Sequence, residues 1–343
     1  MTAISASYHE TVNVLQGMNG KNGLSRNCGP FDRAEWFALL VDAGMRPLVA
    51  VAQGHDAAAA LALTRANGRL EPLRNWYSFT WRPLGAGFDV LTALASDLRG
   101  ESHRVTLWPV PDEDGSATML EAAFTQAGWN VRREQCDHNH VLSVNGRSFA
   151  EYWAERPGRM RTTLKRKAKK VAVAIHTHFD AADWADYERI YDNSWKPEEG
   201  DPALLRRFAE AEAAAGRMRL AIARLDGLAV AAQFWTVENS VAYIHKLAHL
   251  EEHKKLSAGT TLSAALFEHV IDRDGVELVD FGTGNDPYKR DWMEEDRPRY
   301  RIDCLDPTAP RAWPALAKRA VQSLRGSRVK AKGSDRTAGE QPV

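Results

Sequence analysis

A glycine-rich turn after an apolar strand pattern is the segment of this chain best suited to chemistry. Residues 277–281 read as a strand that contains Asp280 and opens at Gly282 and Gly284. Strand ends of this kind are frequent ligand sites in α/β proteins, because a glycine backbone lets a ligand approach closely. Polar and aromatic side chains follow at once: Tyr288, Lys289 and Trp292. We therefore predict a binding site at this strand end.

A second stretch with ligand-binding character lies upstream, directly before an apolar helical pattern. It consists of small and hydroxyl-bearing residues: Ser257, Ala258, Gly259, Thr260 and Thr261. The free N–H groups and the dipole at a helix N-terminus favour an anion such as phosphate. The two stretches together predict a cofactor site divided between a helix N-terminus and a neighbouring strand end.

The composition predicts a soluble cytoplasmic protein. The 343 residues favour two domains or one large one, and 44% of them are hydrophobic. The formal net charge is zero, so no overall field attracts the chain to nucleic acid or to a membrane. Cys28, Cys136 and Cys304 are far apart and form no CxxC, which argues against a disulfide framework or a cysteine-rich zinc site. No apolar run is long enough to span a membrane.

Two halves of the chain follow a similar order of predicted elements. The second half has three strands, a helix and a further strand, at 219–224, 230–237, 241–247, 260–272 and 277–281. The first half has a comparable order that starts with a strand at 47–51 and a hairpin at Asn67-Gly68, followed by a strand-like segment at 78–81. A last strand is predicted at 300–305. We interpret the halves as two similar lobes of an α/β fold with a mixed sheet.

The first lobe has no counterpart of the polar residues that follow Gly284, and we interpret it as degenerate. The predicted boundaries are 1–147 for the degenerate lobe and 148–309 for the catalytic lobe. Residues 310–343 are polar and basic, and we expect this tail to be disordered.

From residue 153 to residue 305 the chain resembles the GNAT superfamily of acyltransferases, in its Fem-like, double-lobed branch. The matching motifs are Ser194-Trp195-Lys196, a strand with Tyr243, His245 and Lys246, the turn Ser257-Ala258-Gly259-Thr260, and Asp280-Phe281-Gly282-Thr283-Gly284 with Tyr288, Lys289 and Trp292. One departure concerns the usual pyrophosphate signature, which is reduced here to the single Gly259.

The resemblance implies how the predicted site would work. In a GNAT fold two central strands splay apart, acyl-CoA lies between them, and its pyrophosphate sits on the helix N-terminus, here 258–262. An acceptor amine attacks the thioester directly, so the enzyme supplies a base and an acid. His245 is the candidate base and Tyr288 the candidate acid, while Asp280 would orient or deprotonate the acceptor. Gly282 and Gly284 would contact the cofactor, and the candidate substrate-binding residues are Trp195, Lys196, Tyr243, Lys246, Lys289 and Trp292.

Each of these assignments has a structural alternative. The turn at Gly282 and Gly284 could serve only as a tight loop, and Tyr288 could be a packed aromatic residue. His245 could be a half-buried structural histidine, because alternate residues of a strand share one face. Trp195 fits a core position better than a ligand contact.

Other chemistries find weaker support in the sequence. Residues 249–253 match a zinc motif, H-x-x-E-H, which requires a helix where we predict a strand end. The histidines in 136–140 have no partner ligands nearby in the sequence. Asp280-Phe281-Gly282-Thr283-Gly284 also resembles a methyltransferase turn, but little structured chain follows it. We therefore predict no metal.

A basic helical pattern at 153–170 leaves the acyl donor open. Its cations are Arg159, Arg161, Lys165, Arg166, Lys167, Lys169 and Lys170. They could form a solvated face, or they could contact the phosphates of RNA. The leading hypothesis is an acyl-CoA-dependent N-acyltransferase, with acetyl-CoA as the simplest donor. Its acceptor would be a small amine such as an amino sugar or a precursor of surface polysaccharide.

The alternatives are a Fem-type transferase that takes aminoacyl groups from tRNA, and a non-catalytic anion-binding protein. No charged coiled-coil hairpin for tRNA is apparent, which favours CoA. Neither the acceptor, the acyl chain length nor the oligomeric state follows from the sequence.

Overall fold

The computed structural model describes residues 4–17, 29–85 and 87–334. In the first half of the chain the elements are β1 (Ser5–His9), α1 (Ala34–Asp42), β2 (Leu48–Gln53), β3 (Ala58–Ala66), β4 (Arg69–Pro72), β5 (Leu84–Gly85), α2 (Phe88–Asp97), β6 (Arg104–Val110), α3 (Ser116–Gln126) and β7 (Asn130–Ser143).

In the second half they are α4 (Phe149–Ala154), α5 (Gly158–Lys167), β8 (Ala172–His176), α6 (Ala181–Asp192), α7 (Pro202–Ala214), β9 (Met218–Leu225), β10 (Leu228–Glu238), β11 (Val241–His249), α8 (Ala258–Glu268), β12 (Leu278–Thr283), α9 (Lys289–Trp292), β13 (Glu295–Leu305) and α10 (Trp313–Ser334).

One mixed sheet runs through the whole molecule, in the order β1-β2-β3-β4-β6-β13-β7-β12-β11-β10-β9-β8, with β5 on β3. Two parallel contacts interrupt its antiparallel pairing, β4 with β6 and β11 with β12. Each parallel pair is joined by a helix, α2 in one lobe and α8 in the other. The two lobes therefore share a topology of three antiparallel strands, a helix and a parallel strand, and this order of strands and helix agrees with the sequence prediction.

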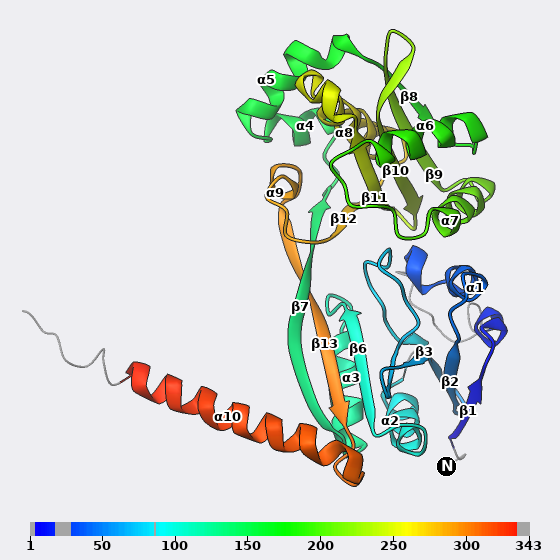
Figure 1. Ribbon diagram of the computed structural model, residues 1–343, viewed down its shortest axis with the longest axis vertical. Coiled ribbons are helices and arrows are strands. Elements are labelled where there is room, and N and C mark those ends of the chain that lie inside the picture. Colours follow the sequence, from blue (N-terminus) through cyan, green and yellow to red (C-terminus); the bar gives the residue numbers. More distant parts are fainter. Residues whose placement is uncertain (1–3, 18–28, 86, 335–343) are drawn as a thin grey trace, which may run out of the picture.

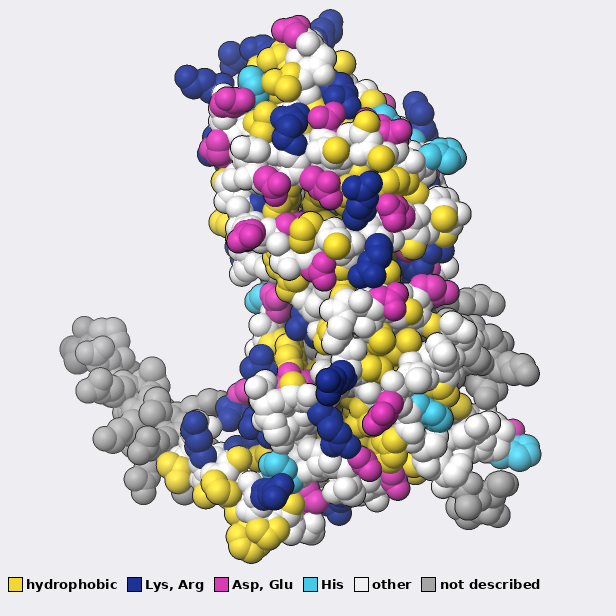
Figure 2. Space-filling view, turned by 45° about the vertical axis from the view of Figure 1, so that its right-hand side comes forward, with side chains coloured by type: hydrophobic (Ala, Val, Ile, Leu, Met, Phe, Trp, Pro, Cys, Tyr) yellow, Lys and Arg dark blue, Asp and Glu magenta, His cyan; other side chains and the backbone are white. Residues whose placement is uncertain are grey.

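The long strands β7 and β13 connect the lobes (Figure 1). They pair with each other from Glu295↔Val141 to Leu305↔Asn130. β7 also pairs with β12 of the second lobe, and β13 with β6 of the first. The molecule narrows where the lobes meet (Figure 2). The predicted strand at 300–305 is thus the end of a longer strand, and that end belongs to the sheet of the first lobe.

Local sequence explains where several elements begin and turn. Ser148 and Glu151 form a reciprocal capping box at the start of α4. The Asp201 carboxylate accepts from the amide of Leu204 at the start of α7, which begins with proline. The turn predicted at Asn67-Gly68 has positive φ at both residues, the geometry that a two-residue hairpin requires.

Two predictions differ from the structure. The helical pattern at 153–170 is divided into α4 and α5, because Pro157 cannot continue a helix. The tail expected to be disordered forms helix α10 over Trp313–Ser334. Residues 335–343 of that tail, and Cys28, lie outside the described residues.

Candidate functional site

The parallel strands β11 and β12 pair over a short distance and then separate. Their register is Val241↔Leu278, Ala242↔Val279 and Tyr243↔Asp280, and no further pair follows in the described chain although both strands continue. A β-bulge in β11 assists the separation, because Ile244 and Lys246 pair with consecutive residues of β10 and His245 is left over. An opening therefore forms in the sheet.

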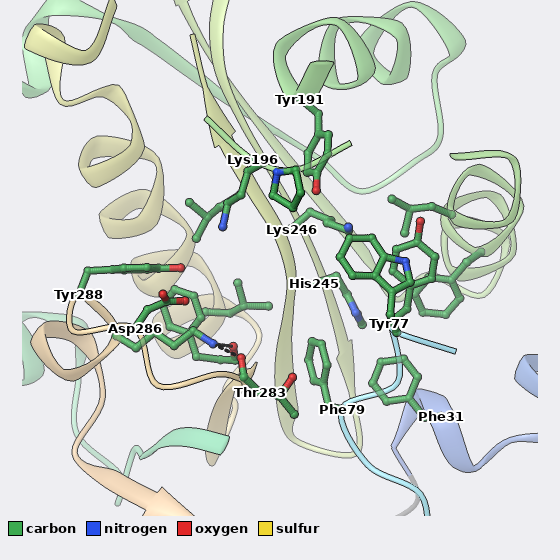
Figure 3. A pocket seen from close by; sticks show the side chains of 18 residues that line it. Phe31, Tyr77, Phe79, Tyr191, Lys196, His245, Lys246, Thr283, Asp286 and Tyr288 are labelled. Carbon is green, nitrogen blue, oxygen red and sulfur yellow. Dashed lines mark hydrogen bonds between the residues drawn. The ribbon is translucent and has the colours of Figure 1, made fainter. Parts of the chain in front are cut away.

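A cavity of about 240 Å³ occupies this opening (Figure 3). Residues 244–247 of β11 lie at its floor, and Phe281 and Thr283 of β12 form one wall. The turn after β12 contributes Asp286 and Tyr288. The opposite wall comes from the first lobe and consists of Phe31, Trp76, Tyr77 and Phe79. The site is therefore built between the lobes.

His245 lies at the centre of an aromatic cluster. Its ring centroid is 5.2 to 5.8 Å from those of four phenylalanines, Phe31, Phe79, Phe208 and Phe234. Its Nε2 lies 2.7 Å from the hydroxyl of Thr236. Burial, together with the positive charges of Lys246 and Arg33, lowers the pKa of His245 to about 3. The imidazole is neutral at physiological pH and accepts protons poorly.

Tyr288 and Asp286 face the cavity from the turn after β12 (Figure 3). The Tyr288 ring packs against Phe281 with centroids 5.7 Å apart. Burial and the neighbouring Asp286 raise the pKa of the Tyr288 hydroxyl well above its usual range. The phenol therefore keeps its proton and can donate it. Lys196 enters from the segment after α6, and burial lowers the pKa of its amine.

Lys289 is buried and stabilises the turn after β12 through hydrogen bonds to backbone carbonyls. It is 4% exposed, and its Nζ donates to the carbonyls of Phe281 at 3.2 Å, Gly282 at 3.4 Å and Thr283. Its ammonium is thus occupied by backbone oxygens at the strand end. Gly282 has φ +68° and lies against Phe79, while the amide of Gly284 donates to the Asp137 carboxylate at 3.1 Å. These three residues shape the turn that carries Asp286 and Tyr288.

Asp280 points to the other face of β12, because neighbouring residues of a strand alternate. Its carboxylate accepts from the side-chain amide of Asn139 at 3.0 and 3.1 Å and from the amide of Gly282 at 2.7 Å. Asp280 and Tyr243 line a second cavity of about 350 Å³ between the lobes. Phe31 and Phe79 line both cavities and lie between them.

Lys246 is held by a carboxylate and three aromatic rings. Its Nζ lies 2.8 Å from Oε1 of Glu199 and 4.2, 4.6 and 4.9 Å from the ring centroids of Trp76, Tyr77 and Tyr191. The Tyr77 hydroxyl donates to the same Glu199 oxygen at 2.7 Å. Because Trp76 and Tyr77 belong to the first lobe, this cluster joins the lobes beside the cavity.

The predicted anion site lies beyond the end of β11. Ser257 precedes α8, and its hydroxyl accepts from Nζ of Lys167 in α5 at 3.0 Å. An ideal Cβ built on Gly259 would lie 3.8 Å from Nδ1 of His249, an ordinary van der Waals contact, so His249 lies beside this helix N-terminus. The Trp195 ring, 45% exposed, packs on the His249 ring with centroids 4.2 Å apart. Trp195 is therefore a surface residue, in contrast to the core position that its sequence suggested.

Neither Trp292 nor the H-x-x-E-H segment at 249–253 contributes to a binding site of the kind that its sequence suggested. Trp292 is 6% exposed and stacks on Phe267 with centroids 5.0 Å apart, so it belongs to the core rather than to either cavity. His249 ends a strand and His253 lies in the 3₁₀ helix at 251–256, so the two histidines do not share the helix that the motif requires. Among the described residues no three metal-ligating side chains form a group that could hold an ion.

Residues 158–290 match a protein family described as an acetyltransferase (GNAT) domain. This segment contains α5, the splayed strands, α8 and the turn after β12, which are the elements that the second lobe contributes to the site. Residues 158–290 therefore form a GNAT domain. The protein is an acyltransferase, and its mixed α/β fold consists of two GNAT-like lobes.

Three solved structures illustrate the double-lobed arrangement. FemX is 10% identical, with a TM-score of 0.62 over 88% of this chain and 97% of its own. L-PGS from Bacillus licheniformis is 12% identical, with a TM-score of 0.58 over 90% and 95%. A tandem GNAT protein from the clavulanic acid biosynthesis pathway is 14% identical, with a TM-score of 0.51 over 90% and 100%. At these identities the similarity concerns the fold, and it confirms the predicted Fem-like, tandem arrangement. The sequence matches no curated protein.

The first GNAT-like lobe has lost the opening of the second. β4 and β6 pair at Leu70↔Val105, as β11 and β12 do, but the chain after β4 turns back between them. Trp81 is buried there, with its backbone amide donating to the Pro109 carbonyl at 2.9 Å and its indole to the Ala62 carbonyl at 3.0 Å. The inserted segment fills the place of such an opening, which is compatible with the prediction that the first lobe is degenerate.

Sequence reasoning missed the contribution of the first lobe to the site. It assigned 78–81 to a strand, whereas residues 74–83 form an irregular segment that carries Trp76, Tyr77 and Phe79 to the cavity of the second lobe. Glu199, which anchors Lys246, was also missed, and no local motif marks it. Asp286 could have been found, because it lies within the turn already singled out.

Proposed function

We propose that the protein transfers an acyl group, with acetyl the simplest, from acyl-CoA to the amine of a small hydroxyl-rich acceptor such as an amino sugar. The observation that carries this proposal is the opening between β11 and β12, with the N-terminus of α8 beside His249 at the end of β11. A thioester can lie in the opening while phosphates rest on the helix N-terminus. Such a donor implies a cytoplasmic reaction and is compatible with the synthesis of surface polysaccharide.

The donor site combines the helix N-terminus with a nearby cation. The amides of the first turn of α8 have no intrahelical partner, and the helix dipole adds positive potential there. Lys167 supplies a full positive charge beside Ser257. Thr260 and Thr261 extend the first turn, and Gly259 brings no side chain of its own between this turn and a phosphate. A pyrophosphate fits these features without the full glycine signature.

The chemistry requires one proton to leave the amine and one to reach the thiolate. The cavity holds Tyr288 as a protonated phenol, and we assign it the hydrogen bond and the proton that the departing sulfur receives. His245 is neutral and a poor base, so in this proposal it lines the site through its aromatic cluster. Asp286 is the carboxylate that lines the same cavity, and we assign it the amine proton. The amine nitrogen forms the new bond to the acyl carbon as the carbon–sulfur bond breaks.

The second cavity is our candidate site for the acceptor. Its charged lining is mixed, with three arginines and four carboxylates: Arg82, Arg297, Arg299, Glu113, Asp114, Glu277 and Asp280. Such a lining offers many hydrogen-bond donors and acceptors without a dominant charge, which suits a neutral hydroxyl-rich molecule that carries an amine. Phe31 and Phe79 line both cavities, so an acceptor held here would direct its amine past these two rings to the thioester, and Asp280 would bind the acceptor rather than the cofactor.

Calorimetry with acetyl-CoA and longer acyl-CoAs tests the donor assignment. We expect wild-type protein to bind with a micromolar Kd and Gly259→Glu to lose binding by at least about 100-fold, because the new carboxylate occupies and repels the phosphate position. The matched control is Gly100→Glu, since Gly100 is exposed and a Cβ there meets nothing within 4 Å. Equal binding by both variants, or none by the wild type, would reject an acyl-CoA donor at this site.

Aminoacyl-tRNA is the second candidate donor. The specific observation in its favour is that basic helix α5 packs on α8 and brings Lys167 to the donor site. The overall likeness to FemX is compatible with it. Filter binding of aminoacylated and uncharged tRNA, with wild type and Lys165→Glu/Lys169→Glu, distinguishes the two donors. Tight tRNA binding that depends on these lysines, without acyl-CoA binding, would select the tRNA donor.

A further inference from the structure

Helix α10 projects from the molecule without covering its core. It follows β13 and extends into solvent from the end of the first lobe, far from the second lobe (Figure 1). Among its described side chains, Arg319 donates to the Asn130 carbonyl at 2.8 Å and lies 2.7 Å from an Asp303 carboxylate oxygen, and Gln322 accepts from Arg132 at 3.1 Å. Neither the acyl cavity nor the second cavity uses this helix.

The helix is strongly basic. Its 22 residues contain six cations and no acidic residue: Lys318, Arg319, Arg325, Arg328, Lys330 and Lys332. The whole chain has zero formal net charge, so this positive charge is a local feature. A helix of this kind needs an anionic surface or strong hydration to offset its self-repulsion.

The same helix also exposes apolar side chains on one face. Trp313 is 57% exposed and Val321 is 48% exposed, and Ala317 lies between them and is exposed as well. The spacing i, i+4, i+8 places all three on one side of an α-helix. Figure 2 shows apolar and basic side chains next to one another at the lower end of the molecule, where α10 begins.

We infer that α10 docks the protein on the surface of an anionic membrane, with Trp313 and Val321 in the interface and the cations on lipid head groups. An exposed tryptophan beside basic residues suits this interface, because the ring partitions there while cations meet the anionic lipids. Binding to RNA phosphates would need the cations alone. A second copy of the helix would bring six positive charges against six. Among the described residues no helix is long and apolar enough to cross a membrane, so docking would be confined to the surface.

Vesicle sedimentation with the full chain tests this inference. Vesicles of phosphatidylcholine with 30% phosphatidylglycerol are compared with pure phosphatidylcholine, at low and high salt. We expect binding to the anionic vesicles only, weakened by salt. Arg325→Glu/Arg328→Glu should reduce affinity by at least about tenfold, and Trp313→Ala/Val321→Ser should also reduce it. Arg46→Glu/Arg273→Glu is the matched control, because it makes the same charge change at two exposed sites away from α10.

Three outcomes would overturn the inference. The first is failure of the wild type to bind anionic vesicles. The second is RNA binding that depends on Arg325 and Arg328 but not on Trp313, without any vesicle binding. The third is concentration-dependent dimerisation in analytical ultracentrifugation that Trp313→Ala abolishes, which would make the exposed face a contact between copies. Because none of these measurements uses acyl-CoA, they stand or fall independently of the proposed reaction.

Discussion

Four aromatic rings surround the imidazole of His245, and this enclosure affects stability as well as chemistry. The pKa of His245 is about 3 in the folded protein, against an ordinary value of 6.5 that applies to the unfolded chain. Between these values the unfolded chain binds a proton that the folded protein does not. The free energy of unfolding therefore falls as pH falls from 6.5 towards 3, and the full contribution is present above pH 6.5.

The His245→Gln variant should lose this pH dependence. Between pH 7 and pH 5 the wild type should lose about 2 kcal/mol more stability than the variant, because each pH unit within the window is worth about 1.4 kcal/mol. Urea unfolding at the two pH values measures the difference. His55→Gln, at an exposed histidine, is the control. If the wild type and His245→Gln respond equally to acid, then His245 is not kept neutral by burial.

Tyr288→Phe tests the proposed proton donor. Removing the hydroxyl should lower kcat by about 10² to 10⁴, the usual contribution of a general acid, and leave acyl-CoA affinity within about twofold. The pKa of Tyr288 lies above its usual range, so the wild-type rate should show no loss of the acid form up to about pH 10. Initial rates with the best acceptor from an amine panel, alongside calorimetry, provide both values.

The control for this variant is Tyr8→Phe, in the first lobe, where the hydroxyl bonds Asp97 at 2.6 Å. Unchanged kcat in Tyr288→Phe would show that a solvent proton reaches the thiolate. An equal fall in acyl-CoA affinity would instead make Tyr288 a binding residue.

At the scale of elements, the turn after β12 depends on two glycines for different reasons. Both have positive φ, +68° at Gly282 and +96° at Gly284, so any side chain adds backbone strain. A Cβ at Gly282 would also lie 2.8 Å from Cζ of Phe79, whereas at Gly284 the nearest atom is Nζ of Lys289 at 3.8 Å. Phe79 of the first lobe therefore leaves no room for a side chain at Gly282, whereas no such crowding occurs at Gly284.

Substitution of these glycines should separate the two effects. Gly284→Ala should cost about 1–2 kcal/mol of unfolding free energy from backbone strain, and Gly282→Ala about 1–3 kcal/mol more from the contact with Phe79. Adding Phe79→Ala should recover most of that second part, which a double-mutant cycle in urea measures. Additive effects of Phe79→Ala and Gly282→Ala would show that the two residues are not in close contact.

The sequence predicted those parts of the site that depend on local pattern. The glycine turn, the start of α8 and the alternation in β11 each follow from short-range rules, so the opening between β11 and β12 lies near the expected residues. The wall formed by Trp76, Tyr77 and Phe79 depends on packing between lobes, which no local pattern encodes. Helix α10 was missed because charge and glycine content were weighed above the helix propensity of its Ala, Leu, Lys and Arg residues.

At the scale of the whole molecule, the boundary predicted at residues 147 and 148 cuts a continuous structure. It separates β7 from β12, although Leu278↔Ser143 and Asp280↔Val141 are paired. It also assigns β13 to the second lobe, although β13 pairs with β6 of the first lobe. Partner choice among distant strands is a tertiary property, so the repeat pattern of the sequence could suggest two lobes but not the two strands that join them.

Because β7 and β13 join the two lobes, we expect the lobes to unfold together. Full-length protein should show a single calorimetric transition, with equal calorimetric and van't Hoff enthalpies.

A fragment of residues 148–343 should be unfolded or aggregated, because β12 loses its neighbour β7 and β13 loses both of its partners, which leaves exposed strand edges. A fragment of residues 129–343 is the matched comparison, since it restores β7 beside β12 and β13. Circular dichroism and size-exclusion chromatography compare the two fragments. Two separate transitions in the full chain, or a well-folded 148–343 fragment, would mean that each lobe is stable by itself and that the shared strands are not essential to the site.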